Sequence, residues 1–207
     1  MIEDFWSEIV TGKSFEKLVE LSKKYNVVVI GGWAVYLFTN MHKSKDIDIV
    51  IDYDTLFKMK SEYAIEKNDR LKKYEAKLGE FDIDIYLPSY SKLMLPIKLI
   101  LEHTKSIKGM TTPTQEVLLI LKQGAEINRR DSIKGRKDII DIITLLIFSG
   151  FNFKIYRKLL KDYKLEFLEN ELIYEIKSFS LKDLKYIGLN QKEFSKWKKD
   201  FMASIKE

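Results

Sequence analysis

The sequence predicts an α+β fold in which a mixed β-sheet flanked by helices is followed by a C-terminal helical domain. Two observations favour this class. Segments that alternate apolar and polar residues, as strands with one buried face do, occur in the first half of the 207-residue chain. From Thr114 onward, apolar residues recur every three or four positions, as in helices that bury one face. We therefore divide the chain into domains at residues 1–110 and 111–207.

Helix and strand patterns alternate from the N-terminus. Apolar residues at helical intervals predict helix within residues 3–25, and Gly12 interrupts the pattern, so two short helices or one broken helix are expected. The run VVVI at residues 27–30 predicts a strand, because β-branched residues favour extended backbone. The glycine pair that follows it allows a tight turn into a helix over residues 33–38.

Two further strands carry acidic residues. Strict alternation predicts strands over residues 46–51 and 81–87, and Pro88 ends the second because proline cannot donate to a sheet. Between them, residues 55–64 have a helical pattern and residues 71–78 a strand pattern. These segments complete the expected sheet.

The second half is expected to be helical. Two apolar stripes at helical spacing indicate two packed helices. Their residues are Val117, Leu118, Leu121 and Ala125 in one stripe, and Ile139, Ile142, Ile143 and Leu146 in the other. The remainder, residues 153–206, is rich in helix patterns and lysine, and its aromatic residues are expected to pack between helices.

Composition limits the chemistry. The chain has no cysteine, which excludes disulfides and cysteine nucleophiles, and its 2 histidines disfavour a His-rich zinc site. A metal ion would therefore be held by oxygen ligands. The net charge of +5 favours a polyanionic partner, although lysines that only solvate helix faces explain it equally well.

The N-terminal segment MIEDFWSEIVTGKSFEKL carries acidic residues early, unlike a secretory signal peptide. No apolar run approaches the ~20 residues that span a membrane. We therefore expect a cytoplasmic protein that has no membrane partner.

Acidic residues within buried strand patterns predict a metal site. Asp46 and Asp48 lie in one such strand, where an unpaired carboxylate would cost several kcal/mol. Asp84, with Asp82 as the alternative, lies in the next acidic strand. Carboxylates suit Mg²⁺, and two ions about 3.5–4 Å apart can hold a nucleoside triphosphate. We predict Asp46, Asp48 and Asp84 as ligands of two Mg²⁺ or Mn²⁺ ions; the alternative is an edge strand with solvent-facing acids.

The glycine pair Gly31-Gly32 opens a predicted helix near these acids. Such a turn offers backbone N–H groups and the positive end of the helix dipole to phosphate groups. A glycine pair also serves as a tight strand-to-helix connection without any ligand. The nearby acids favour the phosphate-binding interpretation.

Together these features resemble the nucleotidyltransferase superfamily with a DNA polymerase β-type palm. The resemblance rests on Gly31-Gly32, on Asp46-Ile47-Asp48-Ile49 and on Asp84 in IDIYLP. It implies that the first two acids bind both metal ions, and that the third binds the catalytic metal and accepts the proton of the attacking hydroxyl. An NTP would be the substrate, and pyrophosphate would be released.

The downstream segment resembles a narrower group. LLILKQGAEINRRDS followed by KGRKDIIDIITLL is similar to the region after the palm in AbiEii-type nucleotidyltransferases, the toxins of certain toxin–antitoxin systems. This resemblance spans residues 27–148. It implies that Lys122 contacts the nucleotide and that Asp138 contributes to catalysis, with Asp141 as its neighbour. It further implies the 3′ end of tRNA or another RNA as acceptor, and a cognate antitoxin protein as partner.

One stretch departs from the family pattern. Such proteins often carry R-x-[ST]-x-D-x-D before the first acids, and this chain has His42 and Ser44 in the first two of those places. Ser44 agrees with the pattern, so we predict it as a nucleotide-binding residue together with Gly31, Gly32 and Lys122. Two other functions stay open: transfer to a small antibiotic-type acceptor, and a non-catalytic palm that binds nucleotide or a partner. Three liganding acids favour catalysis.

Overall fold

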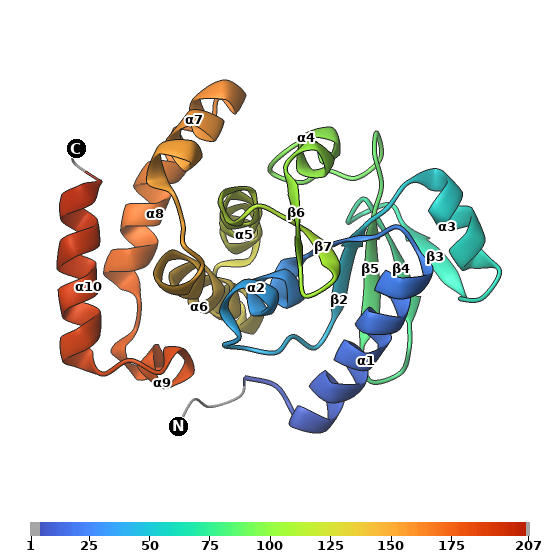
Figure 1. The fold of residues 1–207 in the computed structure, drawn as a ribbon, viewed down its shortest axis with the longest axis horizontal. Coiled ribbons are helices and arrows are strands. Elements are labelled where there is room, and N and C mark those ends of the chain that lie inside the picture. Colours follow the sequence, from blue (N-terminus) through green and yellow to red (C-terminus); the bar gives the residue numbers. More distant parts are fainter. Residues whose placement is uncertain (1–4, 206–207) are drawn as a thin grey trace.

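The computed structural model describes residues 5–205 and confirms the predicted α+β class (Figure 1). The strands are β1 Val28–Ile30, β2 Ile47–Val50, β3 Ile65–Asn68, β4 Lys73–Lys77, β5 Asp82–Tyr86, β6 Thr104–Ile107 and β7 Met110–Pro113. They form one mixed sheet in the order β3-β4-β5-β2-β1-β7-β6. Strand β2 runs parallel to β5 and β1 parallel to β7, whereas the other neighbours pair antiparallel.

Helices flank this sheet and form the C-terminal part. They are α1 Glu8–Lys24, α2 Gly31–Thr39, α3 Tyr53–Lys60, α4 Ile97–Glu102, α5 Gln115–Arg129, α6 Ile133–Phe148, α7 Phe153–Tyr163, α8 Phe167–Ser178, the short 3₁₀ helix η1 Leu181–Asp183, α9 Leu184–Ile187 and α10 Gln191–Ser204. Helices α2, α5 and α6 lie between the sheet and the C-terminal helices (Figure 1). This middle layer supplies one wall of the site described below.

The two central strands are almost entirely apolar. All of β1 is buried, and in β2 the residues Ile47, Ile49 and Val50 are buried, whereas Asp48 is only partly so. Buried β-branched residues favour strands of this kind. Asp48 is therefore the single polar side chain in a strand whose other residues belong to the hydrophobic core.

The N-terminal helix differs from the expectation. Helix α1 runs without a break through Gly12, so the predicted interruption there is wrong. A glycine inside a helix costs about 1 kcal/mol relative to alanine. The buried face that includes Leu18 and Leu21 outweighs this cost, because both side chains are fully enclosed by the core.

The sheet contains strands that the sequence pattern did not indicate, namely β3 and the hairpin of β6 and β7. The hairpin turns at Lys108 and Gly109, which have φ angles of 52° and 77°. Strand β7 pairs with β1 and carries the sheet on to Pro113. Helix α5 starts directly afterwards, and the division into two domains stays a prediction.

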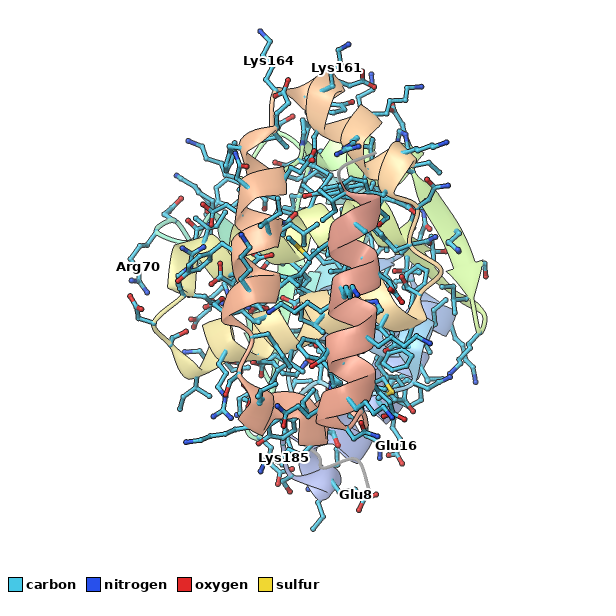
Figure 2. All side chains as sticks on the ribbon, turned by 90° about the vertical axis from the view of Figure 1, so that its left-hand side faces the viewer. Glu8, Glu16, Arg70, Lys161, Lys164 and Lys185 are labelled. Atoms are coloured by element: carbon cyan, nitrogen blue, oxygen red, sulfur yellow. The ribbon has the colours of Figure 1, made fainter. Side chains whose placement is uncertain are left out.

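The C-terminal helices pack on α5 through a buried polar cluster. The hydroxyl of Tyr156 in α7 donates to Oε1 of Gln123 in α5 at 2.6 Å. Nε2 of Gln123 in turn donates to the carbonyl of Leu168 in α8 at 2.9 Å. Figure 2 views this side of the molecule, with α10 in front and Lys161 and Lys164 projecting at one end. Tyr156 is thus a packing residue, as the sequence predicted for the aromatic residues of this segment, whereas Phe167 and Tyr174 are exposed.

Among the described residues, no helix combines the length and the apolar composition that a membrane crossing requires.

Candidate functional site

A cleft of about 690 Å³ opens between the sheet and helices α5 and α6. This volume lies within the usual range for small-molecule sites, about 300–1,000 Å³. The residues predicted for the site all line it: Gly31, Gly32, Ser44, Asp46, Asp48, Asp84, Lys122 and Asp138. Segments up to about a hundred positions apart in the sequence therefore meet in one place, which the sequence pattern alone could not guarantee.

Asp48 and Asp84 are direct neighbours in the sheet. Strands β2 and β5 run parallel with Asp48 opposite Asp84, and both side chains face the cleft. Asp82 lies two residues earlier in β5 and is not among the residues that line the cleft. The geometry therefore favours Asp84 over Asp82 as the partner of Asp48.

The glycine pair allows the acidic strand to approach the start of α2. Gly31 has φ +67°, and a Cβ built on it would lie 2.1 Å from Oδ2 of Asp48. A Cβ on Gly32 would lie 2.6 Å from Oγ of Ser44. Both distances are far below a van der Waals contact, so each glycine makes room for one predicted site residue. The N-terminus of α2 consequently faces the cleft beside Asp48.

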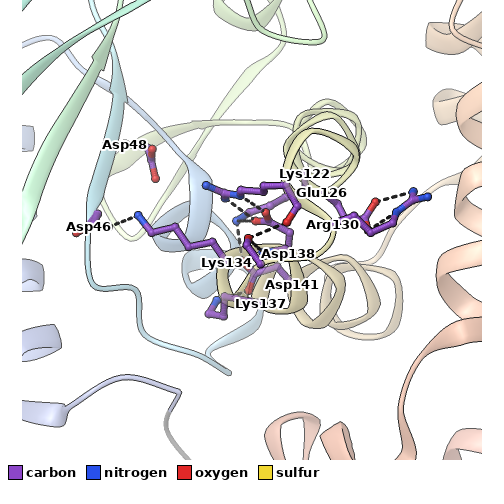
Figure 3. Close-up of polar contacts among 12 residues, drawn as sticks. Asp46, Asp48, Lys122, Glu126, Arg130, Lys134, Lys137, Asp138 and Asp141 are labelled. Atoms are coloured by element: carbon purple, nitrogen blue, oxygen red, sulfur yellow. Dashed lines mark hydrogen bonds and ion pairs between the residues drawn. The ribbon is translucent and has the colours of Figure 1, made fainter. Parts of the chain in front are cut away.

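Two of the three acids are bonded to lysines. Nζ of Lys134, at the start of α6, lies 2.9 Å from Oδ2 of Asp46 (Figure 3). Nζ of Lys73 in β4 lies 2.6 Å from Oδ2 of Asp84. Neither lysine was among the residues predicted for the site. For Lys73, the alternation in KYEAK was a usable signal, because it puts Lys73 on the same sheet face as Asp84.

Asp48 has a different electrostatic environment. The hydroxyl of Tyr86 lies 3.4 Å from its Oδ1. No ion pair to Asp48 is found within residues 5–205, and Figure 3 shows no contact between Asp48 and the other side chains drawn. Burial, with a smaller effect of the neighbouring Asp84, raises the pKa of Asp48 to about 7 against the opposing effect of Lys122 and Arg129. A cation in the cleft would therefore favour the ionised form of Asp48.

The opposite wall is a buried network of charges between α5 and α6. Nζ of Lys122 lies 3.1 Å from Oδ1 of Asp138 and 2.7 Å from Oδ2 of Asp141 (Figure 3). Arg129 binds Asp138 through two nitrogens, at 2.7 and 3.0 Å. Lys137 donates to the other oxygen of Asp141. Both carboxylates are almost fully buried, so their charges are compensated within the protein.

This network shifts the pKa values of Asp141 and Lys122 in opposite directions. Burial alone would raise the pKa of Asp141, but Lys122 and Lys137 outweigh it and lower the value to about 2. Burial lowers the pKa of Lys122, but Asp141 and Asp138 raise it above its ordinary value. At neutral pH a charged Lys122 therefore lies against a charged Asp141.

Two polar residues of the segments quoted above, His42 and Arg130, lie outside the cleft lining. His42, which stands at a motif position, is fully buried and approaches the hydroxyl of Thr144 at 3.4 Å, outside the cleft lining. Burial, with a smaller effect of Lys137, lowers its pKa to about 4, so it is neutral at pH 7. Arg130 binds Glu126 and Glu171 and connects α5 to α8. The contacts of His42 and Arg130 therefore hold neighbouring elements together and do not reach the cleft.

The three strand acids are a suitable donor set for a divalent cation. Hard cations such as Mg²⁺ prefer carboxylate oxygens, and Asp48, whose pKa is raised by burial and by the neighbouring Asp84, would gain from a cation beside it. In the part of the chain that the structure describes, no three His, Cys, Asp or Glu side chains are already gathered closely enough to hold a metal ion. Asp46 and Asp84 would exchange their lysine partners for the ion.

Comparison with protein families gives one match. Residues 11–100 match a family described as a nucleotidyltransferase of unknown function (DUF6036). The match supports the nucleotidyltransferase superfamily. It covers the glycine pair and the strand acids, but it ends before Lys122 and Asp138. The AbiEii-type subfamily stays a prediction.

Solved structures with similarity to the chain include two that share 18% sequence identity with it. One is an antigenic nucleotidyltransferase-like protein from Paracoccidioides brasiliensis, with a TM-score of 0.36 over 67% of this chain and 73% of that one. The other is JHP933 from Helicobacter pylori, with a TM-score of 0.44 over 97% of this chain and 99% of that one. No curated protein sequence matches the chain significantly.

Proposed function

We propose that the protein is a metal-dependent nucleotidyltransferase, which transfers a nucleoside monophosphate from an NTP to an acceptor hydroxyl. The observation that carries this proposal is the pairing of Asp48 with Asp84 on neighbouring parallel strands, both facing the cleft beside Gly31. The family match over residues 11–100 supports it.

The strand acids have distinct roles in this reaction. Asp46, Asp48 and Asp84 would hold Mg²⁺ or Mn²⁺, which when bound neutralises charge that develops on the phosphates. The acceptor oxygen forms a bond to the α-phosphorus while the bond from that phosphorus to the bridging oxygen breaks. Asp84 accepts the proton of the acceptor hydroxyl, and pyrophosphate leaves with the electron pair of the broken bond.

The start of α2 is suited to the triphosphate. Backbone N–H groups at a helix N-terminus bind anions, and the helix dipole adds to the effect. Gly31 and Gly32 let this terminus approach Asp48 and Ser44 directly, so phosphate oxygens and the strand acids would share the same end of the cleft. Ser44 is then within reach as an additional donor.

Lys122 and Asp138 act from the other wall. In this proposal the positive charges of Lys122 and Arg129 attract the nucleotide, and Asp138 holds both side chains in place. This differs in emphasis from a direct catalytic role for Asp138, because both of its oxygens already accept bonds from these cations. The network therefore holds Lys122 and Arg129 at fixed positions in the cleft wall.

For the acceptor, the first candidate is the 3′ end of a tRNA or of another RNA, as in an AbiEii-type toxin with a cognate antitoxin. The net charge of +5 supports a polyanionic acceptor. A small antibiotic-type hydroxyl compound and a non-catalytic role in nucleotide or partner binding are the alternatives.

One incubation separates these functions. Purified protein receives Mg²⁺, each labelled NTP in turn, and either bulk RNA or a small-molecule cell extract, with Asp48→Asn as the matched inactive variant. Label in tRNA supports the first candidate, and label on another RNA moves the proposal to that acceptor. Pyrophosphate release with no labelled RNA indicates a small acceptor. Nucleotide binding without pyrophosphate release in any mixture would overturn the proposal in favour of a binding domain.

A further inference from the structure

A row of carboxylates crosses four neighbouring strands of the sheet. Asp48 in β2 is opposite Asp84 in β5, Asp84 is opposite Glu75 in β4, and Glu75 is opposite Glu66 in β3. Side chains opposite one another in adjacent strands lie on the same sheet face, so the row extends the strand acids away from the cleft. Like charges in such a row repel unless a cation lies among them.

Lys73 is that cation. Its Nζ lies 2.6 Å from Oδ2 of Asp84 and 2.9 Å from Oε1 of Glu75, so it bridges two members of the row. The lysine side chain is only 13% exposed and that of Asp84 15%, which makes this pair less screened than a surface ion pair. Nδ2 of Asn68 also donates to Glu75 at 3.1 Å and fixes that carboxylate.

We propose that Lys73 competes with the divalent metal for Asp84, and that Glu75 holds the lysine when the metal displaces it. The inference rests on the proposed function, since it concerns the metal affinity of that same site. Lys73 lines the cleft beside Asp84, so a metal ion and the ammonium group would neutralise the same oxygen. The existing bond to Glu75 means that the lysine keeps one partner after it releases Asp84.

Lys73 and Glu75 are therefore positioning residues that set metal affinity in opposite directions. Without Lys73, Asp84 has no competing cation and the metal binds more tightly. Without the charge of Glu75, Lys73 has only Asp84 as a charged partner and the metal binds more weakly. A lysine that only stabilises the sheet would produce no tightening on removal, because a damaged site loses affinity.

The test is a titration with Mn²⁺ alone, in which the free ion is followed by electron paramagnetic resonance in the absence of nucleotide. We expect Lys73→Met to lower the Kd about fivefold and Glu75→Gln to raise it about fivefold, the scale of one partly screened ion pair. Lys73→Arg keeps the charge and should stay within about twofold of the unchanged protein.

Matched controls remove the same charges nearby. The control variants are Lys77→Met, on the same strand as Lys73, and Glu66→Gln, on the neighbouring strand β3. Neither Lys77 nor Glu66 is bonded to Asp84 in the structure. If Lys77→Met lowers the Kd for Mn²⁺ as much as Lys73→Met does, the change comes from long-range electrostatics and the inference is overturned. An unchanged or higher Kd for Lys73→Met, in protein with an unchanged circular dichroism spectrum, also overturns it. If Lys73→Met does not fold, Lys73→Gln takes its place with the same expectation.

The result also separates the two proposals. If the unchanged protein binds Mn²⁺ and Lys73→Met binds it equally well, only the competition fails. If neither protein binds Mn²⁺, the metal-dependent function fails and the competition fails with it.

Discussion

A Cβ on Gly31 would lie 2.1 Å from Oδ2 of Asp48, so the first residue of α2 and the central acid of β2 occupy adjoining space that only glycine leaves open. This contact sets the distance between the start of the helix and the acidic strand. The phosphate-binding and metal-binding parts of the proposed site therefore depend on one small residue.

Gly31→Ala should disrupt both the fold and the site. The substitution forces a clash with Asp48 and places a Cβ at φ +67°, which costs about 1–3 kcal/mol in backbone strain alone. We expect a lower melting temperature and loss of nucleotide transfer. Gly12→Ala is the matched control, because nothing lies within 4 Å of a Cβ there and the helical position should gain about 1 kcal/mol. Equal effects of the two substitutions would contradict this assignment.

Asp84→Asn should abolish transfer while triphosphate binding stays measurable. Removal of a group that accepts a proton in the reaction lowers kcat by a factor on the order of 10²–10⁴. Asp82→Asn provides the comparison, because Asp82 shares the strand and the sheet face but does not line the cleft. Single-turnover transfer and equilibrium binding of labelled NTP distinguish the two effects. A fully active Asp84→Asn protein would remove Asp84 from the mechanism.

Asp141→Asn should destabilise the protein strongly. The substitution leaves Lys122 and Lys137 short of counter-charge in a buried network, and breaking a buried pair costs about 3–5 kcal/mol. The folded pKa of Asp141 is about 2, below its ordinary value of 3.8, so its contribution is present above pH 3.8 and is lost as the pH falls towards 2. Urea unfolding at pH 7 and at low pH measures both effects. Asp131→Asn, at an exposed position, should change stability by less than about 0.5 kcal/mol.

Glu175→Gln should remove a pH dependence of stability. Burial, reinforced by Glu126, raises the pKa of Glu175 to about 9, and its Oε1 has no hydrogen-bond partner in the structure. The folded pKa lies above the ordinary value of 4.5. The contribution of protonated Glu175 to the free energy of unfolding is therefore fully present below pH 4.5 and is lost as the pH rises through 9. The amide needs no proton, so the variant should be more stable than the unchanged protein at pH 8 to 9, on the order of 1 kcal/mol.

Chemical unfolding between pH 5 and pH 9 tests this expectation. The exposed Glu166→Gln is the control and should leave the slope of stability against pH unchanged. If Glu175→Gln and the unchanged protein keep a constant difference over the whole range, Glu175 is not the group that titrates.

Local sequence patterns were sufficient for much of the fold. The β-branched run before Gly31 and the alternation around Asp48 and Asp84 predicted the central strands, because the period of two follows directly from strand geometry. The hairpin of β6 and β7 was missed, since its strands are short and its pairing with β1 lies about eighty residues away in the sequence. Long-range pairing of this kind leaves little local signal.

The site divides in the same way. Residue types and spacing predicted which groups supply charge or an accessible backbone N–H to the site. These are the glycine pair, the strand acids, Lys122 and Asp138. Only the tertiary structure decided their partners. It placed Lys73 on Asp84, Lys134 on Asp46, and Lys122 between two buried carboxylates, because ion pairing depends on distances between segments that the folded sheet and helices bring together.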